Sequence, residues 1–475
     1  MIKLTMNELH YEYDIRGLLM SFYPGVEIEC NSECNKEVEA EINLVIDYET
    51  DKITVTLNSE QEVLNCFWED AKNELKRCVY RLLSKRENGR VLPWGTLTGI
   101  RPIKLPMALM EQGKTDEQIQ NELRDTYYIS KEKLDLSIKI AHTEQKLLEK
   151  IDVEDGYSLY IGIPFCPTTC LYCSFTSYPF TKYEDKIGDY LHALKKEILY
   201  TASKFKGKKL NSIYFGGGTP TTLKPEQLDW LLDLVATNFD LSDCFEWTVE
   251  GGRPDSITRE KLKVMKNYPV DRISINPQTM KQETLDLIGR RHTVEQFRSA
   301  YEMAREEGYT NINMDLILGL PEETTEDVRR TMEEMKLLGP DNLTIHTLAL
   351  KRAARLTIEK DQYAHLHFEQ NTNDMMQITM DVTKEMGLEP YYLYRQKNMS
   401  GNLENIGYAK PGLEGVYNIL IMEEKQSILA LGAGSVTKRV EPDGRITRAS
   451  NVKNIEQYME RIDEMIDRKE ALWNN

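Results

Sequence analysis

The sequence lacks the features that define several large classes of protein. No apolar run approaches the ~18 residues needed to cross a bilayer, so we expect no membrane span. The 60 Lys and Arg residues are outnumbered by 77 Asp and Glu residues, and the net charge of −17 at pH 7 argues against a general nucleic-acid binder. The first residues contain no apolar core of the length that a secretory signal needs. Eight cysteines among 475 residues are too few for a disulfide scaffold, so we expect a cytoplasmic protein with reduced thiols.

The length and composition indicate a folded protein with more than one domain. A chain of 475 residues is long enough for about two to four domains. Charged residues make up 29% and hydrophobic residues 40%, which is typical of globular rather than disordered chains. Residues 1–150 contain no catalytic motif and are expected to form an α+β accessory domain. Within it we expect strands over 40–48 and 53–57, and helices over 60–85 and 131–150.

Residues 151–350 show a regular alternation of short β-prone runs and helical patterns. The six expected strands are residues 158–163, 212–215, 246–250, 272–276, 311–318 and 343–350. The helical patterns between them are residues 185–205, 225–239, 258–267, 294–307 and 325–338. This alternation predicts an α/β fold with a parallel sheet covered by helices. Six units rather than eight predict an open, partial (β/α)6 barrel, with the active site at the C-terminal ends of the strands.

The alternation is lost after residue 350. We expect residues 351–475 to form a smaller C-terminal domain that acts as a substrate lid, with helices over 368–387 and 454–471. The segment 429–435, Leu-Ala-Leu-Gly-Ala-Gly-Ser, is expected to allow tight backbone packing near this lid.

The strongest chemical signal is Cys166-Pro-Thr-Thr-Cys170-Leu-Tyr-Cys173, directly after the first expected barrel strand. Three thiolates on so short a loop can bind three corners of a cubane iron–sulfur cluster, because thiolates are the soft ligands that such clusters need. The fourth iron would keep an open site for the amino and carboxylate groups of a methionine. The alternatives are ordinary thiols or part of a zinc site, which normally needs a second, distant pair of ligands. Cys30 and Cys34 mimic half of the motif, but we expect them and the other cysteines to be structural.

The cysteine motif, together with Tyr160-Ile-Gly-Ile-Pro-Phe-Cys166 and Gly216-Gly-Gly-Thr-Pro-Thr221, resembles the radical S-adenosylmethionine (SAM) enzymes. Within them it resembles the oxygen-independent coproporphyrinogen III oxidase family over residues 158–349. The N-terminal extension and Leu97-Thr-Gly-Ile-Arg-Pro-Ile-Lys104 are similar to the HemZ branch of that family. The resemblance implies an oxidoreductase with a [4Fe-4S] cluster and SAM as cofactors. It also implies an electron donor such as flavodoxin or ferredoxin, and reductive cleavage of SAM to a 5′-deoxyadenosyl radical.

The same resemblance implies a SAM pocket at the strand ends. A glycine-rich segment after the second strand would let the backbone approach the methionine group of SAM. Its residues are Gly217, Gly218 and Thr219. Tyr160 and Tyr172 flank the cysteine loop and match aromatic residues that line the cofactor in the family, with core packing as the alternative. Ala349 matches a position whose backbone contacts the adenine.

Charged and polar residues at the later strands are expected to complete the SAM pocket. Glu250 can accept hydrogen bonds from an ammonium or a ribose, or be a solvated strand-end residue. The resemblance assigns Gln278 to the ribose and Arg290 to the methionine carboxylate, which a guanidinium binds with two parallel hydrogen bonds. The neighbouring Arg291 leaves open which arginine points inward. Asp315 would bind the ribose or form a buried salt bridge, because an unpaired charge inside an apolar strand is costly.

In the family the substrate is a porphyrinogen, whose propionates are oxidatively decarboxylated to vinyl groups as coproporphyrinogen III becomes protoporphyrinogen IX. A substrate with four carboxylates predicts a locally basic pocket. The candidates are Lys351, Arg352 and Arg355 directly after the sixth strand, for which a solvated helix start is the alternative. Arg101 and Lys104 are further candidates.

One position departs from the characterised oxidases, which carry a fourth Cys two residues after the third. Phe175 stands there in this sequence, as it does in the related haem-chaperone branch. Cleavage of SAM is therefore expected on the cysteine motif, while the tetrapyrrole reaction stays open. A porphyrinogen oxidase, a haem-binding chaperone and a haem-modifying radical SAM methyltransferase remain as readings. The catalytic residues are left unassigned.

Overall fold

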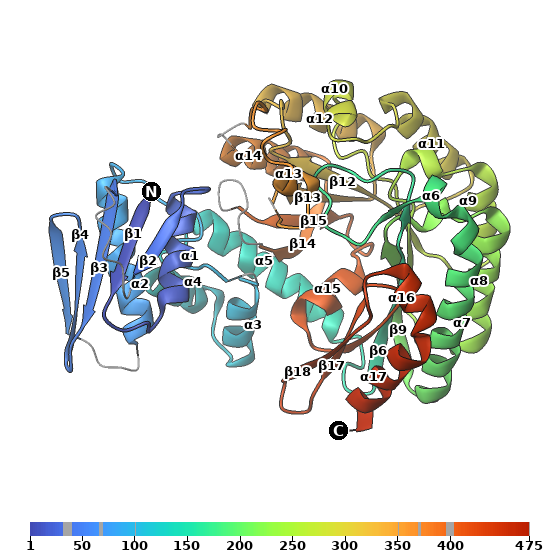
Figure 1. Cartoon of the computed structure of the whole chain (residues 1–475), viewed down its shortest axis with the longest axis horizontal. Coiled ribbons are helices and arrows are strands. Elements are labelled where there is room, and N and C mark those ends of the chain that lie inside the picture. Colours follow the sequence, from blue (N-terminus) through green and yellow to red (C-terminus); the bar gives the residue numbers. More distant parts are fainter. Residues whose placement is uncertain are drawn as a thin grey trace. The chain divides into compact units, whose positions relative to one another are not determined.

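The computed structural model describes residues 1–31, 40–65, 70–99, 101–349, 351–368, 372–395 and 403–474. The chain forms two compact units (Figure 1). Unit 1 comprises Met1–His142 and Leu393–Glu404, and unit 2 comprises Thr143–Tyr392 and Asn405–Asn475. No helix in the described ranges is long and apolar enough to cross a membrane.

Unit 1 is an α+β unit built on a five-stranded sheet with the order β2-β1-β3-β4-β5. The strands are β1 (Ile2–Met6), β2 (Ile28–Asn31), β3 (Ile42–Tyr48), β4 (Lys52–Leu57) and β5 (Glu60–Asn65). The helices are α1 (Glu12–Phe22), α2 (Ala71–Arg86), α3 (Lys104–Glu111), α4 (Asp116–Tyr127) and α5 (Lys131–Leu148), the last of which continues into unit 2. Apolar residues of α1, α2 and the sheet form one buried core.

The helix expected over residues 60–85 is wrong in its first part. Residues 60–65 are β5, which pairs with β4 in an antiparallel hairpin. Asn58 supplies the left-handed backbone of the turn, with φ 53°, a conformation that Asn tolerates better than most residues. Val63 is consequently 53% exposed on an edge strand instead of buried on a helix. Phe67, which also supported the helical pattern, lies outside the described residues.

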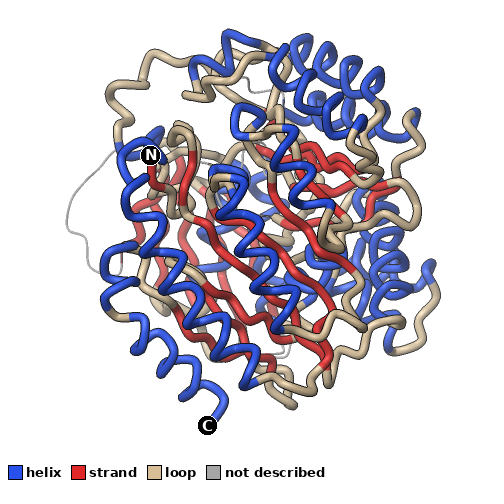
Figure 2. The backbone as a smooth tube through the Cα atoms, turned by 90° about the vertical axis from the view of Figure 1, so that its right-hand side faces the viewer, coloured by secondary structure: helices blue, strands red, loops and turns tan. Residues whose placement is uncertain are grey.

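Unit 2 contains the expected six parallel strands in sequential order. They are β6 (Gly156–Ile163), β9 (Lys209–Gly217), β10 (Glu246–Glu250), β11 (Arg272–Ser274), β12 (Ile312–Leu318) and β13 (Asn342–Thr347). The helices that follow these strands are α7 (Ile187–Lys204), α8 (Pro225–Asn238), α9 (Arg259–Lys266), α11 (Val294–Glu306) and α12 (Thr325–Leu338). Figure 2 shows helices lying over the strands of the sheet. Most strand residues are buried because helices cover the sheet, as parallel sheets require. The partial (β/α)6 barrel is therefore confirmed.

The C-terminal part of the chain completes the barrel sheet on both edges. Strand β16 (Ser427–Leu431) runs parallel to β6 and is followed by β17 (Val436–Val440) and β18 (Ile446–Ser450). At the other edge, β15 (Asn405–Ala409) pairs antiparallel with β13 and is followed outward by β14 (Glu389–Tyr394). The boundary expected at residue 350 therefore does not coincide with the division into compact units. The physical reason is that an open barrel leaves two edges of unpaired backbone groups, and these strands pair with them.

Helices from the same C-terminal part pack on unit 2. They are α14 (Thr372–Glu385), α15 (Val416–Glu423), α16 (Ile455–Glu460) and α17 (Ile462–Asn474). The expected tight packing of segment 429–435 is present. A Cβ atom on Gly432 would lie 2.5 Å from the carbonyl oxygen of Gly162, and one on Gly434 would lie 2.7 Å from the hydroxyl of Thr176. This segment therefore packs against the end of β6 and against the cysteine loop.

Candidate iron–sulfur and cofactor site

The three cysteines of the motif lie on a loop at the C-terminal end of β6. Strands β7 (Phe165–Cys166) and β8 (Tyr178–Pro179) pair over two residues and close this loop at its base. The amide of Cys173 donates to the carbonyl oxygen of Cys170 at 3.2 Å, which makes a tight turn between the second and third thiols. All three cysteines are free thiols. The loop is therefore where the (β/α) architecture places an active site.

The glycine run after β9 supports the loop directly. The amide of Gly218 donates to the carbonyl oxygen of Ile163 at 2.8 Å, and the amide of Thr219 donates to that of Phe165 at 2.8 Å. A Cβ atom on Gly218 would approach the oxygen of Phe165 to 2.6 Å, so a side chain at this position would push the two segments apart. These two amides hold the entry to the cysteine loop.

The opposite side of the loop contacts the segment after α10 (Gln282–Leu287). The amide of Leu171 donates to the carbonyl oxygen of Ile288 at 2.9 Å. The hydroxyl of Thr168 donates to the carbonyl oxygen of Gly289, also at 2.9 Å. The loop therefore connects the first, second and fourth units of the barrel, which are far apart in the sequence.

The thiols lie in a partly desolvated environment. Burial raises the pKa of the Cys166 thiol to about 12, even though the nearby Thr219 hydroxyl, 3.5 Å from its sulfur, lowers it. Burial also raises the pKa of Cys173. A thiol with a raised pKa stays protonated near neutral pH unless a cation stabilises the thiolate, and a bound metal does this most strongly.

The arrangement fits an iron–sulfur cluster better than a single ion. In the described part of the chain, no three Cys, His, Asp or Glu side chains are close enough to share one metal ion. A cubane cluster does not need them to be, because each of the three thiolates binds a different iron. The soft sulfur donors, their position on one short loop and their state as free thiols all fit this group.

Arg290 is buried and Arg291 is exposed, so Arg290 is the arginine of the doublet that points inward. Its Nη2 atom donates to the carbonyl oxygen of Gly252 at 3.2 Å, and Nη1 donates to that of Asn276. Its Nε–H is buried and has no hydrogen-bond partner. A buried guanidinium with an unused donor is suited to an anionic group such as a carboxylate.

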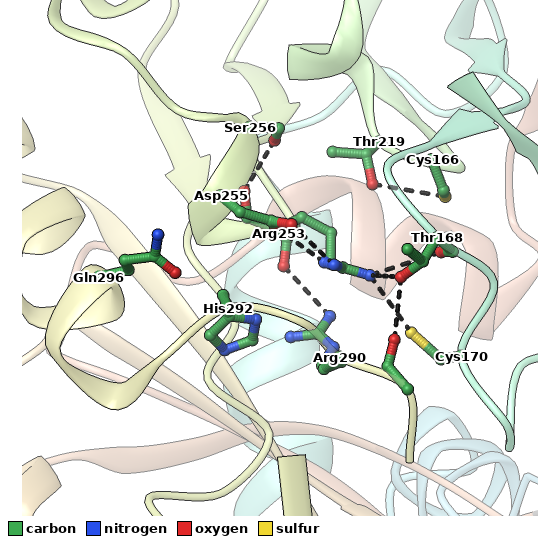
Figure 3. Close-up of polar contacts among 12 residues, drawn as sticks. Cys166, Thr168, Cys170, Thr219, Arg253, Asp255, Ser256, Arg290, His292 and Gln296 are labelled. Atoms are coloured by element: carbon green, nitrogen blue, oxygen red, sulfur yellow. Dashed lines mark hydrogen bonds and ion pairs between the residues drawn. The ribbon is translucent and has the colours of Figure 1, made fainter. Parts of the chain in front are cut away.

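A second buried arginine beside the loop was missed by the sequence analysis. Arg253 contacts Thr168, Cys170 and Asp255, and Figure 3 shows it between the cysteine loop and Asp255. His292 lies beside Arg290 in this view. Burial, and then the charges of Arg290 and Arg253, lower the pKa of His292 to about 3, so this histidine is neutral near neutral pH. Only the run Gly251-Gly252-Arg253 next to Glu250 could have drawn attention to Arg253 from the sequence.

Glu250 ends β10 and faces the interior of the barrel. Its carboxyl accepts a hydrogen bond from the hydroxyl of Tyr214. Burial raises the pKa of Glu250 to about 7, with the Tyr214 hydrogen bond lowering it and the negative charge of Asp315 raising it further. The solvated strand-end reading does not hold for this half-buried residue, which changes protonation state near neutral pH.

Gln278 and Asp315 are joined by the backbone. The amide of Gln278 donates to the carbonyl oxygen of Asp315 at 2.9 Å, and Gln278 has a φ of 69°, in the left-handed region. Its side-chain oxygen is buried and has no hydrogen-bond partner. An unused acceptor in a buried position and a strained backbone are both common at binding sites.

Asp315 already has partners in the structure. Its carboxylate accepts hydrogen bonds from the amides of Asn276 at 2.9 Å and Asn313 at 2.7 Å, and lies 3.7 Å from Nε2 of His346. Burial alone would raise the pKa of Asp315, but the contacts with His346 and Asn313 hold it below its usual value. The salt-bridge alternative for Asp315 is thus partly realised. Two carboxylate oxygens still have capacity for further donors.

The two tyrosines beside the loop have different surroundings. Tyr160 stacks on Tyr214 with ring centroids 6.2 Å apart and on Tyr417 of α15 at 6.3 Å, and Tyr214 is the residue that donates to Glu250. A Cβ atom on Gly217 would lie 3.2 Å from the Tyr160 hydroxyl, so the tyrosine stack reaches the glycine run. Tyr172 packs at the edge of an apolar cluster that includes Leu171. Core packing therefore accounts for part of the role of both residues.

The basic residues expected to bind the substrate differ in their exposure and in their ion-pair partners. Lys351 is half-buried, and its Nζ atom lies 5.6 Å from the ring centroid of Phe175, which is 68% exposed. Arg352 is exposed, whereas Arg355 forms an ion pair with Glu359 at 3.0 Å. Ala349 is half-buried just after β13.

The remaining candidates lie in the other compact unit. Arg101 precedes α3 and Lys104 begins it, both in unit 1. Cys30 is also in unit 1, half-buried in β2, and Cys34 lies outside the described residues. The cysteine motif and the strand-end candidates, by contrast, all belong to unit 2.

Comparison with known proteins agrees with this geometry. Residues 160–335 match the model of the radical SAM superfamily. The chain is similar to the oxygen-independent coproporphyrinogen-III oxidase-like protein HemZ of Bacillus subtilis, with 44% identity over 82% of this chain and 79% of that protein. It is 31% identical to the heme chaperone HemW of the same organism, over 65% of this chain and 76% of that one. Among solved structures it is similar to the coproporphyrinogen III oxidase HemN of Escherichia coli, with a TM-score of 0.54 and 25% identity over 68% of this chain and 73% of that chain.

Proposed function

Because this chain belongs to the oxygen-independent coproporphyrinogen III oxidase-like family of the radical SAM superfamily, we propose that it oxidatively decarboxylates the propionates of coproporphyrinogen III. The family's cofactors are a [4Fe-4S] cluster and SAM. The observation that carries the proposal is the loop of three free thiols at the end of the first barrel strand, surrounded by buried polar groups with unused hydrogen-bonding capacity. We further propose that the reaction takes place in the cytoplasm, with flavodoxin or ferredoxin as the electron donor.

A cluster bound by the three cysteines would, together with SAM, supply the radical chemistry that removes a hydrogen atom from the substrate. The protein's part is to hold the reacting groups and exclude water. In this proposal Cys166, Cys170 and Cys173 bind the cluster. Arg290 binds the methionine carboxylate through its unused Nε–H, and Glu250 accepts a hydrogen bond from the amino group.

The ribose and adenine of SAM would lie further along the sheet. The free side-chain oxygen of Gln278 and the remaining capacity of Asp315 suit ribose hydroxyls. The backbone beside Ala349 is proposed for the adenine, and Gly217 for a close approach to the methionine group. Tyr160 and Tyr172 would close the floor and the loop side of the pocket.

Lys351 and Arg352 are the better candidates for the substrate propionates. Both follow β13 at the C-terminal side of the barrel, and neither is held in an ion pair among the described residues, whereas Arg355 is. Phe175 beside Lys351 offers an exposed aromatic face on which a flat tetrapyrrole can stack.

A haem-binding chaperone is the second candidate. Phe175 occupies the position where the resemblance places a fourth cysteine in the oxidases, and several relatives are heme chaperones. In that case the same aromatic and basic residues would bind haem without turnover.

Anaerobic product analysis separates these functions. The reconstituted protein is incubated with dithionite, SAM and coproporphyrinogen III, and we expect 5′-deoxyadenosine and protoporphyrinogen IX. If the release of 5′-deoxyadenosine does not change when coproporphyrinogen III is added, and the protein binds haem stoichiometrically, it is instead the chaperone. Transfer of a methyl group to haem would identify a methyltransferase.

Cys170→Ala tests the cluster assignment independently of the substrate. We expect loss of the broad iron–sulfur absorbance near ~400 nm and of SAM cleavage, because the cluster loses one of its three thiolates. Cys244→Ala is the matched control, since Cys244 is a half-buried thiol outside the loop whose sulfur contacts the carbonyl oxygen of Glu246. Retention of both signals in Cys170→Ala would remove the basis of the proposal.

A further inference from the structure

Arg253 has two sets of contacts that point in opposite directions. The residue lies in the turn after β10 and is 2% exposed. Its Nε and Nη2 atoms donate to the two carboxylate oxygens of Asp255 at 2.9 and 2.8 Å. Its Nη1 atom donates to the hydroxyl of Thr168 at 2.9 Å and lies 3.8 Å from the sulfur of Cys170 (Figure 3). One guanidinium thus joins a carboxylate to the cysteine loop.

The turn that carries Arg253 is tightly constrained. Gly252 has a φ of 49°, in the left-handed region that favours glycine. A Cβ atom on Gly251 would lie 2.6 Å from the carbonyl oxygen of Ser274, so the backbone packs directly on the next strand. These two glycines aim the Arg253 side chain back across the strand ends toward the cysteines.

The contact continues through Thr168 to the next loop. The hydroxyl that accepts from Arg253 donates to the carbonyl oxygen of Gly289 at 2.9 Å. Arg290, the neighbour of Gly289, donates to the carbonyl oxygen of Gly252 at 3.2 Å, next to Arg253. The segments that carry Cys170, Arg253 and Arg290 are therefore tied to one another by hydrogen bonds.

We propose that Arg253 is a positioning residue of the iron–sulfur site, which holds Cys170 in place through Thr168 and tunes the cluster by donating to the Cys170 sulfur. A donor and a positive charge beside a cluster sulfur stabilise the reduced cluster, which carries one more negative charge, and so raise its reduction potential. Asp255 orients the guanidinium and partly neutralises it, so it acts on the potential in the opposite sense. The pair sets how readily the cluster accepts an electron, whatever the final substrate is.

The test is a redox titration of the reconstituted full chain, followed by electron paramagnetic resonance. For Arg253→Gln we expect the equilibrium constant for cluster reduction to fall about tenfold, which lowers the midpoint potential by about 59 mV for a one-electron couple. For Asp255→Asn we expect a shift to higher potential. Opposite shifts from two members of one ion pair are not expected if the pair only stabilises the fold.

Arg259→Gln is the matched control, since it removes the same charge from an exposed arginine on α9 that pairs with Glu306 and Glu307. Its potential is expected to equal that of the wild type. Arg253→Lys keeps the charge, but its single ammonium cannot contact Asp255 and Thr168 at the same time. Its midpoint potential is expected to lie between those of wild type and Arg253→Gln. An unchanged potential in Arg253→Gln with full iron and sulfide content would overturn the proposal.

If Arg253→Gln does not retain the cluster, the cluster-free chain provides the test. Hydrogen exchange across residues 166–175 is expected to be faster in Arg253→Gln than in wild type and in Arg259→Gln, because the loop loses its contact through Thr168. Equal exchange rates in the three proteins would contradict the positioning role.

Discussion

Single residues at the strand ends show how burial changes the chemistry of ordinary side chains. Glu250, Asp315 and Arg290 are all charged or titratable groups in a region that the barrel walls and the tyrosine stack shield from water. Their hydrogen-bond and charge partners decide whether each group is ionised near neutral pH. Asp315 has amide donors and remains ionised, whereas Glu250 has one hydroxyl donor and an acidic neighbour. Two neighbouring carboxyls therefore differ in charge near neutral pH, as their surroundings dictate.

Glu250 gives a pH-dependent prediction. A carboxyl with a pKa of about 7 is mostly neutral below that pH and accepts hydrogen bonds strongly only above it. We expect the ratio of wild-type to Glu250→Gln affinity for SAM to rise with pH through about 7, with up to about a tenfold change per pH unit on the acidic side. Equilibrium binding of SAM to reconstituted protein across this range measures the ratio. Glu260→Gln, an exposed carboxylate on α9, is the control, and a flat ratio would argue against Glu250 as a ligand.

At the scale of elements, the cysteine loop depends on the strand beside it. The glycine run at the end of β9 holds the loop through two backbone hydrogen bonds, and a glycine is required at position 218 because its neighbours are backbone atoms that cannot move aside. The amides of Gly218 and Thr219 therefore support the loop, and the assignment of these two residues to the methionine group of SAM stays a prediction. Gly217 instead lies close to the Tyr160 hydroxyl.

Gly218→Ala tests this dependence. The new Cβ atom would lie 2.6 Å from the carbonyl oxygen of Phe165 and 2.8 Å from that of Ile163, so we expect a loss of about 1–3 kcal/mol in stability and a lower iron content. Gly188→Ala in α7 is the control, since no atom lies within 4 Å of its added Cβ. That change is expected to stabilise the helix by about 0.5–1 kcal/mol. Urea unfolding and iron analysis measure both effects, and equal behaviour of the two variants would refute the steric argument.

At the scale of unit 2, a buried polar network ties the C-terminal helix to the barrel. Glu197 of α7 is fully buried and lies 2.5 Å from Nζ of Lys469 of α17, which is also buried. Glu197 also accepts hydrogen bonds from the Asn451 side chain at 2.7 Å, the Gly432 amide at 2.8 Å and the Tyr458 hydroxyl at 2.6 Å. The Glu197 carboxylate thus connects the last helix, the strands at the barrel edge and the glycine segment beside the cysteine loop.

Lys469→Met should destabilise the protein by about 3–5 kcal/mol, because it leaves the Glu197 carboxylate buried without its cation. The double variant Glu197→Gln with Lys469→Met is expected to recover part of the loss. Lys196→Met is the matched control, because Lys196 and Asp463 join the same two helices through an exposed pair at 3.4 Å. That exposed pair is worth less than about 1 kcal/mol. Chemical unfolding measures all three variants, and a loss as small for Lys469→Met as for Lys196→Met would be inconsistent with a buried network.

Features that depend on local order along the chain could be predicted from the amino acids alone. The spacing of Cys166, Cys170 and Cys173 and the six strand–helix units are local patterns, and the structure has both. The same local reasoning failed where two patterns overlap, as at residues 60–65, whose apolar spacing fits a helix but which pair with β4. Features that depend on contacts between residues far apart in the chain required the tertiary structure. The tertiary structure shows that Arg290 is buried and Arg291 exposed, and that Arg253 lies beside Cys170. It also shows that strands after residue 350 pair with both edges of the barrel. Burial and pairing partners are properties of the folded chain, and no spacing along the sequence contains them.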